Sequence, residues 1–268
     1  MVTVKDALLF LKHRISSDFE TREILCFILS IEKTTLLSEP ERLLQKDEVR
    51  RIKKAALLRK KNVPLQYILG YWEFYGRRFF VDRRVLIPRS DTETLIDAVK
   101  AKSGPSPRFL DLCAGSGIIG LTLEKELSGS GVMVEKDKKA LSLLRENSAL
   151  HNSRLEIVRA DVLKNCHFGN FDIIVSNPPY VTKGEYKTLD KQVKKEPKKA
   201  LVAPENGLLF YRKIVENFSN CLNPDGFFAF EIGAGQKKAV EKILSDFAEI
   251  STIKDLSGND RVVIASRG

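Results

Sequence analysis

The chain has 268 residues, of which 43% are apolar and 30% are charged, and its formal net charge is +10. This composition supplies enough apolar material for a buried core and excludes a disordered or collagen-like chain. No apolar run approaches the roughly 18 residues of a membrane span, and no secretory leader is evident, so we expect no membrane association and a cytoplasmic protein. The four cysteines form no C-x-x-C pair, which favours reduced thiols over disulfides or a zinc site.

The first part of the chain is predicted to be helical and basic. Apolar residues recur three and four positions apart between residues 4 and 62, as in amphipathic helices, and Pro40 suits the first turn of a helix. Residues 50–61 contain seven cations, and residues 183–199, which we expect to form a long loop, contain seven lysines. Such charge favours an acidic or RNA-containing partner, although a solvated helix face and a solvated loop are the better explanation of either stretch taken alone.

The pattern changes at residue 66 to aromatic and β-branched residues. Through residue 87 this composition predicts a β-hairpin that turns near Gly76. After Pro88, the spacing of Ser90 and Glu93 predicts a capping box in front of a helix. We therefore divide the chain into a helical bundle (residues 1–63), a hairpin linker (64–88) and a third domain (89–268).

The third domain alternates predicted strands with predicted helices. Helices are expected from Gly117, over residues 137–150 and 208–222, and from Gln236. The strands are expected at residues 108–112, 132–135, 155–159, 171–176, 226–232, 250–255 and 261–265. This α/β alternation predicts a mostly parallel sheet with helices on both faces. Because only five residues link the last two strands, they are predicted to form an antiparallel hairpin at one end of the sheet.

Polar residues and glycines follow the first two of these strands. Asp111 lies at the end of the first strand, and Gly115 and Gly117 allow the backbone to turn sharply and approach a ligand. Cys113 stands where a dinucleotide-binding fingerprint has its first glycine, so a dinucleotide site is disfavoured. Glu135, at the tip of the second strand, can accept hydrogen bonds from both hydroxyls of a ribose.

Two further carboxylates lie near this expected site. Asp137 is predicted to cap the helix that follows it. Asp161 follows the third strand, where it can bind an adenine amino group beside Val162 or simply form a loop turn.

The most informative motif is Asn177-Pro178-Pro179-Tyr180, directly after the fourth strand. Two prolines fix the backbone and remove two amide donors. The side-chain carbonyl of Asn177 and the main-chain carbonyl of Pro178 can then face a pocket as rigid acceptors, with the Tyr180 ring nearby. Two acceptors beside a flat ring suit a planar amino group, which has two N–H donors.

These motifs, in this order, resemble S-adenosylmethionine-dependent methyltransferases that act on amino or amide nitrogens, which have a Rossmann-like fold with a seven-stranded, mostly parallel sheet. Further segments resemble the protein-glutamine N5-methyltransferase family, whose members modify the glutamine of the Gly-Gly-Gln motif in peptide chain release factors. The resemblance covers almost the whole chain and is carried by residues 64–70, 74–76, 86–89, 91–93 and 255–261.

The resemblance implies roles for individual residues. S-adenosyl-L-methionine, converted to S-adenosyl-L-homocysteine, would be bound by Asp111, Gly115, Gly117, Glu135, Asp161 and Asn177. Catalysis on the substrate amide is assigned to Asn177, Pro178, Pro179 and Tyr180, and substrate binding also to Arg89 and Glu196. The helical bundle would recognise the release factor, and no metal is expected. Two positions depart from the family pattern: Cys113 replaces a glycine, and Ser90 replaces a proline.

Three other functions fit parts of the sequence. Asn-Pro-Pro-Tyr also occurs in DNA adenine methyltransferases, so an N6-adenine methyltransferase of DNA or RNA is one alternative, although no target-recognition domain is evident and nucleic acid is disfavoured as the substrate. Methylation of a ribosomal protein glutamine is a second alternative. A non-catalytic adaptor is the third, because a fold alone does not prove activity.

Overall fold

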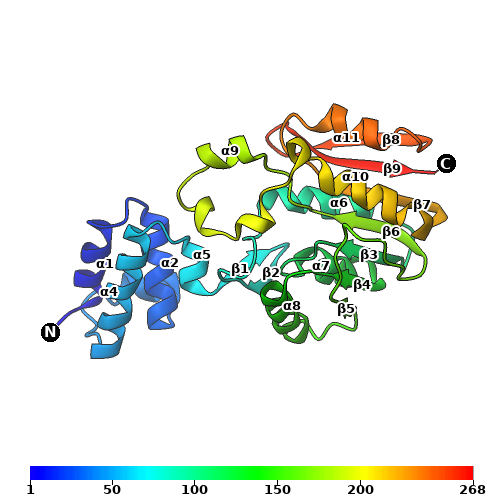
Figure 1. The fold of residues 1–268 in the computed structure, drawn as a ribbon. Helices are drawn as coiled ribbons and strands as arrows, with labels where there is room; N and C mark the ends of the chain where they lie inside the picture. The colour runs from blue at the N-terminus through cyan, green and yellow to red at the C-terminus, as the bar shows by residue number, and fades with distance from the viewer. Residues whose placement is uncertain (268) are drawn as a thin grey trace. The chain divides into compact units, whose positions relative to one another are not determined.

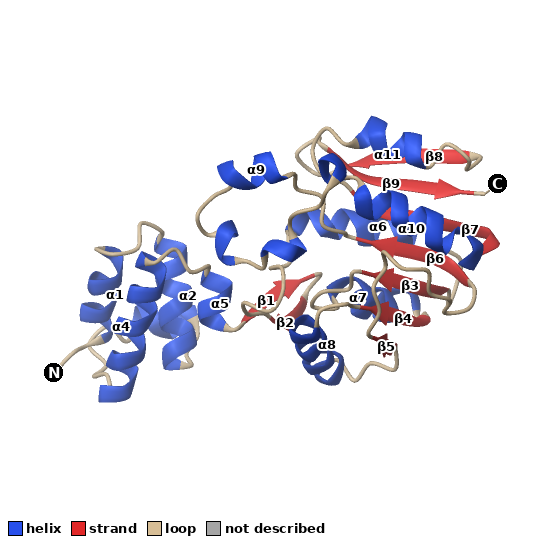
Figure 2. Cartoon of the chain, in the orientation of Figure 1, coloured by secondary structure: helices blue, strands red, loops and turns tan. Residues whose placement is uncertain are grey.

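The computed structural model describes residues 1–267 and divides the chain into two compact units. One unit comprises residues 1–71 together with residues 190–195, and the other comprises residues 72–189 and the chain from Glu196 onward. Figures 1 and 2 show the elements of both units. No helix within residues 1–267 is long and apolar enough to cross a membrane.

The first unit is helical. Its helices are α1 (Val4–Lys12), α2 (Asp18–Leu29), α3 (Lys33–Ser38), α4 (Lys46–Lys60) and α5 (Leu65–Leu69). The core of this unit includes the fully buried Leu11, Ile24 and Leu25. Ile15 and Ile28, four positions after Leu11 and Ile24, are also buried, as the helical spacing predicts. Arg59 on α4 binds both carboxylate oxygens of Glu20 on α2, at 2.8 and 2.7 Å.

One predicted helix start in this unit is wrong. Pro40 lies in a turn after α3, and the next helix begins only at Lys46. The main-chain carbonyl of Pro40 instead accepts a hydrogen bond from the Lys5 N–H, and Thr3 forms an isolated antiparallel bridge with Leu43. The chain around Pro40 therefore pairs with the start of α1, which competes with a helical first turn.

The predicted hairpin is present as β1 (Tyr71–Phe74) and β2 (Arg77–Phe80). Its turn residues Tyr75 and Gly76 both have positive φ, 51° and 69°, as a tight two-residue hairpin turn requires. Residues 65–69, which we assigned to the hairpin linker, form α5.

A seven-stranded sheet organises the second unit. The strands are β3 (Arg108–Leu112), β4 (Ser130–Val134), β5 (Glu156–Val158), β6 (Phe171–Ser176), β7 (Leu222–Glu231), β8 (Glu249–Lys254) and β9 (Asp260–Ser266). Their order across the sheet is β5-β4-β3-β6-β7-β9-β8. Only β9 runs antiparallel to its neighbours, β7 and β8. The predicted fold, including the antiparallel hairpin at one end, is confirmed.

The helices of this unit are α6 (Glu93–Lys102), α7 (Ile118–Leu127), α8 (Lys138–Leu150), α9 (Lys183–Thr188), α10 (Leu209–Phe218) and α11 (Lys237–Ile243). Short 3₁₀ turns occur at Ser90–Thr92, Lys198–Ala200, Glu205–Gly207 and Ser219–Cys221, and one at Val193–Lys195 belongs to the first unit. The basic stretch at residues 183–199, which we expected to be a loop, begins with the helix α9, because Thr182 and Glu185 form a capping box there.

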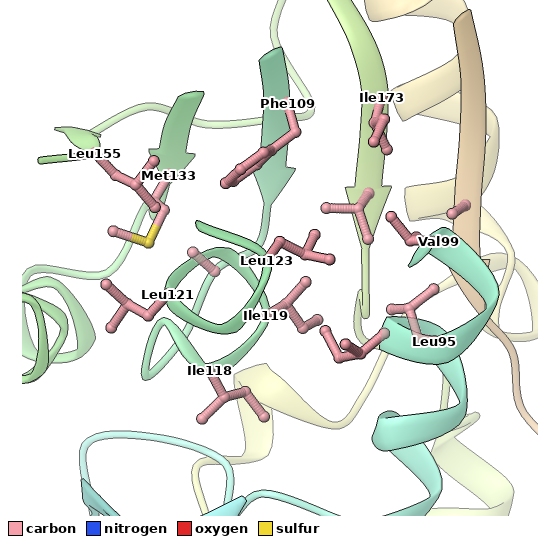
Figure 3. Packing of buried hydrophobic residues seen from close by; sticks show 14 of the residues in the cluster. Leu95, Val99, Phe109, Ile118, Ile119, Leu121, Leu123, Met133, Leu155 and Ile173 are labelled. Atoms are coloured by element: carbon pink, nitrogen blue, oxygen red, sulfur yellow. The ribbon is translucent and has the colours of Figure 1, made fainter. Parts of the chain in front are cut away.

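Alternating side chains on the strands build one core on each face of the sheet. Phe109 and Ile173 belong to the core covered by α6 and α7, whereas Leu110 and Ile174 belong to the core covered by α10. Figure 3 shows α6 and α7 presenting Leu95, Val99 and Ile119 toward β3 and β6. By the same alternation, Asp111 and Glu231 point to the α6 and α7 face.

The predicted capping box at Ser90 is wrong. The helix α6 begins at Glu93 after a 3₁₀ turn, and no side chain caps it. The Glu93 carboxylate instead accepts a hydrogen bond from the main-chain N–H of Tyr75 in the hairpin turn, at 2.8 Å. A contact from a distant part of the chain has replaced the local one.

Candidate active site

A cavity of about 610 Å³ lies at the carboxyl ends of the central parallel strands. The chain order reverses between β3 and β6, and open α/β sheets bind ligands at such a switch point. The loops after β3, β4, β5 and β6 all contribute to the wall. The lining includes Cys113, Gly115, Ser116, Val134, Glu135, Asp161, Val162, Asn177 and Pro179.

The loop after β3 supplies backbone to this cavity. Cys113, Gly115 and Gly117 all have positive φ, at 64°, 57° and 84°. Cys113 therefore occupies a conformation that favours glycine. Gly117 does not line the cavity, and a side chain there is disfavoured, since the φ is positive and a Cβ would crowd the side chains of Leu144 and Leu121.

Asp111 lies beneath this loop and is fully buried. Its Oδ2 accepts a hydrogen bond from the Gly120 N–H at 2.9 Å, whereas its Oδ1 has no partner within residues 1–267. Burial raises the pKa of Asp111 to about 7. Asp111 is not among the residues that line the cavity, so it supports the loop from behind.

The carboxylate of Glu135 sits at the rim, at the end of β4. It accepts hydrogen bonds from the Gly115 N–H at 3.0 Å and the Asp137 N–H at 2.7 Å, which tie the β3 loop to the β4 loop. Burial raises the pKa of the Glu135 carboxyl, and these donors oppose the rise. Asp137 caps α8 through the N–H groups of Lys139 and Ala140, as predicted.

Asp161 lines the cavity beside Val162. Its Oδ1 accepts a hydrogen bond from the Leu163 N–H at 3.2 Å, and its Oδ2 pairs with Lys136 Nζ at 2.8 Å. Partial burial opposes ionisation of Asp161, yet Lys136 and the Leu163 N–H hold the pKa of this carboxyl below its usual range. Asp161 thus forms a loop turn through the Leu163 N–H and also faces the cavity.

The Asn-Pro-Pro-Tyr corner follows β6. Asn177 and Pro179 line the cavity; Pro178 is buried, and neither it nor Tyr180 is among the lining residues. The side-chain nitrogen Nδ2 of Asn177 donates to Glu231 Oε2 at 2.7 Å and to Thr92 Oγ1 at 3.3 Å. Of these two acceptors, Thr92 lines the cavity and Glu231 does not. Because both bind the nitrogen, the Asn177 carbonyl oxygen is left as an acceptor.

Tyr180 is held by the same acid. Its hydroxyl donates to Glu231 Oε1 at 3.3 Å. Burial, together with the charge of Glu231, raises the pKa of the Tyr180 hydroxyl, so this group is a neutral donor.

Arg89 and Glu196 form a structural pair beside the cavity. Arg89, which lines the cavity, donates to Glu196 Oε1 at 2.5 Å, and the Ile87 N–H donates to Glu196 Oε2 at 2.9 Å. Glu196 is 4% exposed and does not line the cavity. Its carboxylate therefore anchors the segment around residue 89.

Sequence reasoning missed Glu231 and Thr92. Glu231 ends β7, next to the corner, because Ser176 of β6 pairs with Phe230 of β7. It follows a buried apolar strand, as Asp111 does, and the same rule about strand ends would have selected it. Thr92 follows no strand, so that rule would not have selected it; it lies in segment 91–93, which carries part of the family resemblance but no assigned role.

Comparison with known proteins agrees with this geometry. The methyltransferase small domain family matches residues 90–210, and the PrmC N-terminal domain family matches residues 3–70. A release factor glutamine methyltransferase of Fusobacterium nucleatum is 40% identical over 92% of this chain and 73% of its own length. That of Thermodesulfovibrio yellowstonii is also 40% identical, over 92% of each chain. This chain belongs to the release factor glutamine methyltransferase family.

Solved structures support the fold of this family member. A methyltransferase from Pyrococcus furiosus matches with a TM-score of 0.57 and 19% identity, over 84% of this chain and 100% of its own. A 16S rRNA N2 G1207 methyltransferase of T. thermophilus, in complex with AdoMet and guanosine, matches with a TM-score of 0.52 and 19% identity, over 74% of this chain and 50% of its own. At this identity the likeness shows a methyltransferase fold.

The cavity suits the methyl donor of such enzymes. Its volume of about 610 Å³ lies within the range of small-molecule and cofactor sites. A carboxylate at the tip of β4 is placed for ribose hydroxyls, and Val134 and Val162 provide apolar walls for a base. The residues present therefore fit a nucleoside-containing donor.

Proposed function

We propose that this protein transfers a methyl group from S-adenosyl-L-methionine to the side-chain amide nitrogen (N5) of the glutamine in the Gly-Gly-Gln motif of peptide chain release factors, releasing S-adenosyl-L-homocysteine. The family assignment supports the reaction class. The observation that carries the proposal is the hydrogen bonding of Asn177, whose side-chain nitrogen is held by Glu231 and Thr92 and whose carbonyl oxygen is left to accept from a substrate amide.

Donor binding is assigned to the loops after β3, β4 and β5. When bound, S-adenosyl-L-methionine supplies an electrophilic methyl group on a positively charged sulfur. Glu135 would hold the ribose hydroxyls, Asp161 the adenine amino group, and the backbone near Gly115 the remainder of the molecule. Asp111 and Gly117 would keep that backbone in place without touching the donor, since neither lines the cavity.

The chain must overcome the weak nucleophilicity of an amide nitrogen, whose lone pair is delocalised into its carbonyl. Asn177 Oδ1 would accept one N–H group of the glutamine amide. The main-chain carbonyl of Pro178, which lies between the lining residues Asn177 and Pro179 but does not itself line the cavity, would accept the other once the substrate enters. Fixing both N–H groups turns the nitrogen lone pair toward the methyl group, and such positioning can lower a barrier by about 7–11 kcal/mol. No general base is needed before transfer, because the nitrogen becomes acidic as it gains the methyl group.

The helical unit would recognise the release factor. Lys53, Lys54, Lys60 and Lys61 on and just after α4 are exposed and offer a basic surface to an acidic protein. Changing these four lysines to glutamate should raise the apparent KM for the release factor and leave that for the donor unchanged. An unchanged KM for the release factor would place recognition elsewhere.

Mass spectrometry of a release factor incubated with the enzyme and S-adenosyl-L-methionine tests the function. We expect one added methyl group on the Gly-Gly-Gln peptide, and none when that glutamine is replaced by alanine. Parallel incubations with a ribosomal protein fraction and with adenine-containing DNA use the same labelled donor. Label in either of these, with none in the release factor, would overturn the proposed substrate.

A further inference from the structure

Glu231, at the end of β7, hydrogen-bonds to the Asn177 side chain. Glu231 does not line the cavity. We propose that Glu231 is a positioning residue for methyl transfer: its carboxylate selects the rotamer of Asn177 that turns the side-chain carbonyl oxygen toward the substrate. The inference rests on the proposed function and assigns a residue that acts through Asn177.

The contacts of Glu231 show how the selection works. The residue is 1% exposed, and its Oε2 accepts hydrogen bonds from Thr92 Oγ1 at 2.6 Å and from Asn177 Nδ2 at 2.7 Å. A carboxylate can only accept hydrogen bonds, so the group of Asn177 that faces it must be the NH₂. A flipped Asn177 amide would set oxygen against oxygen in a buried place.

Thr92 reinforces this choice. Its single hydroxyl proton is donated to Glu231, so the oxygen that it turns toward Asn177 Nδ2 is an acceptor. Glu231 and Thr92 therefore both present acceptors to the Asn177 amide, so its NH₂ group must face them. An unrestrained asparagine can rotate its side-chain amide by 180°. Here that rotation would place the amide oxygen against two acceptor oxygens.

Tyr180 completes the environment of the acid. Its hydroxyl donates to the other carboxylate oxygen, Oε1, at 3.3 Å. Burial raises the pKa of the Glu231 carboxyl. The hydrogen bond from Thr92 and the guanidinium of Arg261, which pairs with Asp255 and Asp91 at 3.1 Å each, oppose the rise and favour the carboxylate. The carboxylate thus has donors at both oxygens, as a buried charge requires.

The orientation matters because the substrate amide brings two donors. With the carbonyl oxygen of Asn177 toward the cavity, an N–H group of the substrate amide meets a hydrogen-bond acceptor. With the amide flipped, the NH₂ of Asn177 would face the NH₂ of the glutamine, and the substrate nitrogen would lose one of its two restraints. Glu231 should therefore affect turnover more than the binding of either substrate.

Steady-state kinetics on the full chain, with a release factor as methyl acceptor, tests this role. Glu231→Gln keeps the shape but allows either end of its amide to face Asn177, so we expect kcat to fall about 10-fold or more. The KM values for donor and release factor should stay within about 2-fold, since uniform binding is not lost. Tyr211→Phe is the matched control: it removes a 2.9 Å hydrogen bond to the Glu231 main-chain oxygen and should leave kcat within about 2-fold.

A paired exchange separates positioning from mere support of the fold. Asn177→Asp places two carboxylates face to face and should lower kcat steeply. Adding Glu231→Gln restores a donor behind residue 177 while one aspartate oxygen still faces the cavity, so the double variant should recover about 10-fold relative to Asn177→Asp alone. A structural role predicts that the two losses add.

The possible outcomes are distinct. If the wild-type chain does not methylate the release factor, the proposed function fails. If it does, and either Glu231→Gln keeps the wild-type kcat or the double variant is no better than Asn177→Asp, the positioning role is overturned. The comparison between Asn177→Asp and the double variant remains decisive even if Glu231→Gln by itself lowers stability.

Discussion

The loops after β3 and β6 border the same cavity, and each rests on a buried carboxylate on the α6 and α7 face of the sheet. Beneath the β3 loop, Asp111 binds one main-chain N–H, of Gly120, and its second oxygen has no partner in the described chain. Behind the β6 loop, Glu231 receives three side-chain donors. Asp111 therefore fixes the path of a backbone, whereas Glu231 fixes the direction of side chains.

The difference separates binding from chemistry. A backbone loop with positive-φ residues presents N–H groups and close approach, which suits holding a cofactor. A corner stiffened by two prolines presents oxygens at fixed positions, which suits orienting a reacting group. If this division is correct, changes in the two loops should move different measured quantities.

Asn177→Ala should have the largest effect. Removing the Asn177 carbonyl oxygen frees one N–H of the substrate amide, so kcat should fall at least about 1,000-fold while the Kd of the donor stays within about 2-fold. Single-turnover kinetics and calorimetry measure the two quantities. Asn223→Ala is the control, because Asn223 donates to Asp172 at the opposite end of β7. Equal losses of turnover and donor binding would erase the distinction between the loops.

Asp111→Asn should change how stability depends on pH. The pKa of Asp111 in the fold, about 7, lies above its ordinary value of 3.8, so the folded chain binds the proton more tightly than the unfolded chain. This contribution to stability is complete below pH 4 and is lost as the pH rises through 7, by up to roughly 4 kcal/mol at about 1.4 kcal/mol per pKa unit. Asparagine does not titrate. The free energy of unfolding of Asp111→Asn, measured relative to that of the wild type, should therefore increase between pH 5 and pH 8.

Urea unfolding at those two pH values measures this effect. Asp161→Asn is the control: the pKa of Asp161 is lowered, so its contribution changes only below pH 4. A difference between Asp111→Asn and wild type that stays constant from pH 5 to pH 8 would show that the buried acid remains ionised in the fold.

Much of this comparison could be predicted from sequence, because it depends on local patterns. The strands β3 and β6 were predicted with their observed bounds, since each is a short apolar run followed by polar residues or glycine. What failed depended on contacts between distant segments. Glu93 was expected to cap its own helix but binds the N–H of Tyr75, and Thr92 meets Glu231 across 139 positions of sequence. No local pattern encodes such a pairing.

Glu135→Ala should weaken donor binding more than turnover. The variant loses the acceptor for the Gly115 and Asp137 N–H groups and the expected ribose contact, so the Kd of the donor should rise about 10- to 100-fold. At saturating donor, kcat should remain within a few-fold of wild type. Glu156→Ala, an exposed carboxylate at the start of β5, serves as the control. A loss of kcat with unchanged donor affinity would assign Glu135 to the chemistry of the β6 loop.

Cys113→Gly should have the smallest effect and an unusual sign. At φ 64° a residue with a Cβ is strained by about 1–2 kcal/mol, and glycine avoids this strain. Glycine also makes the unfolded chain more flexible, which lowers stability by about 0.5–1 kcal/mol. The net gain should raise Tm by about 1–3 °C. Cys166→Gly is a close control, because Cys166 packs against the same core without positive φ and should lower Tm. If both variants lower Tm alike, thiol packing outweighs backbone strain, and the β3 loop is held by its side chains as the β6 loop is.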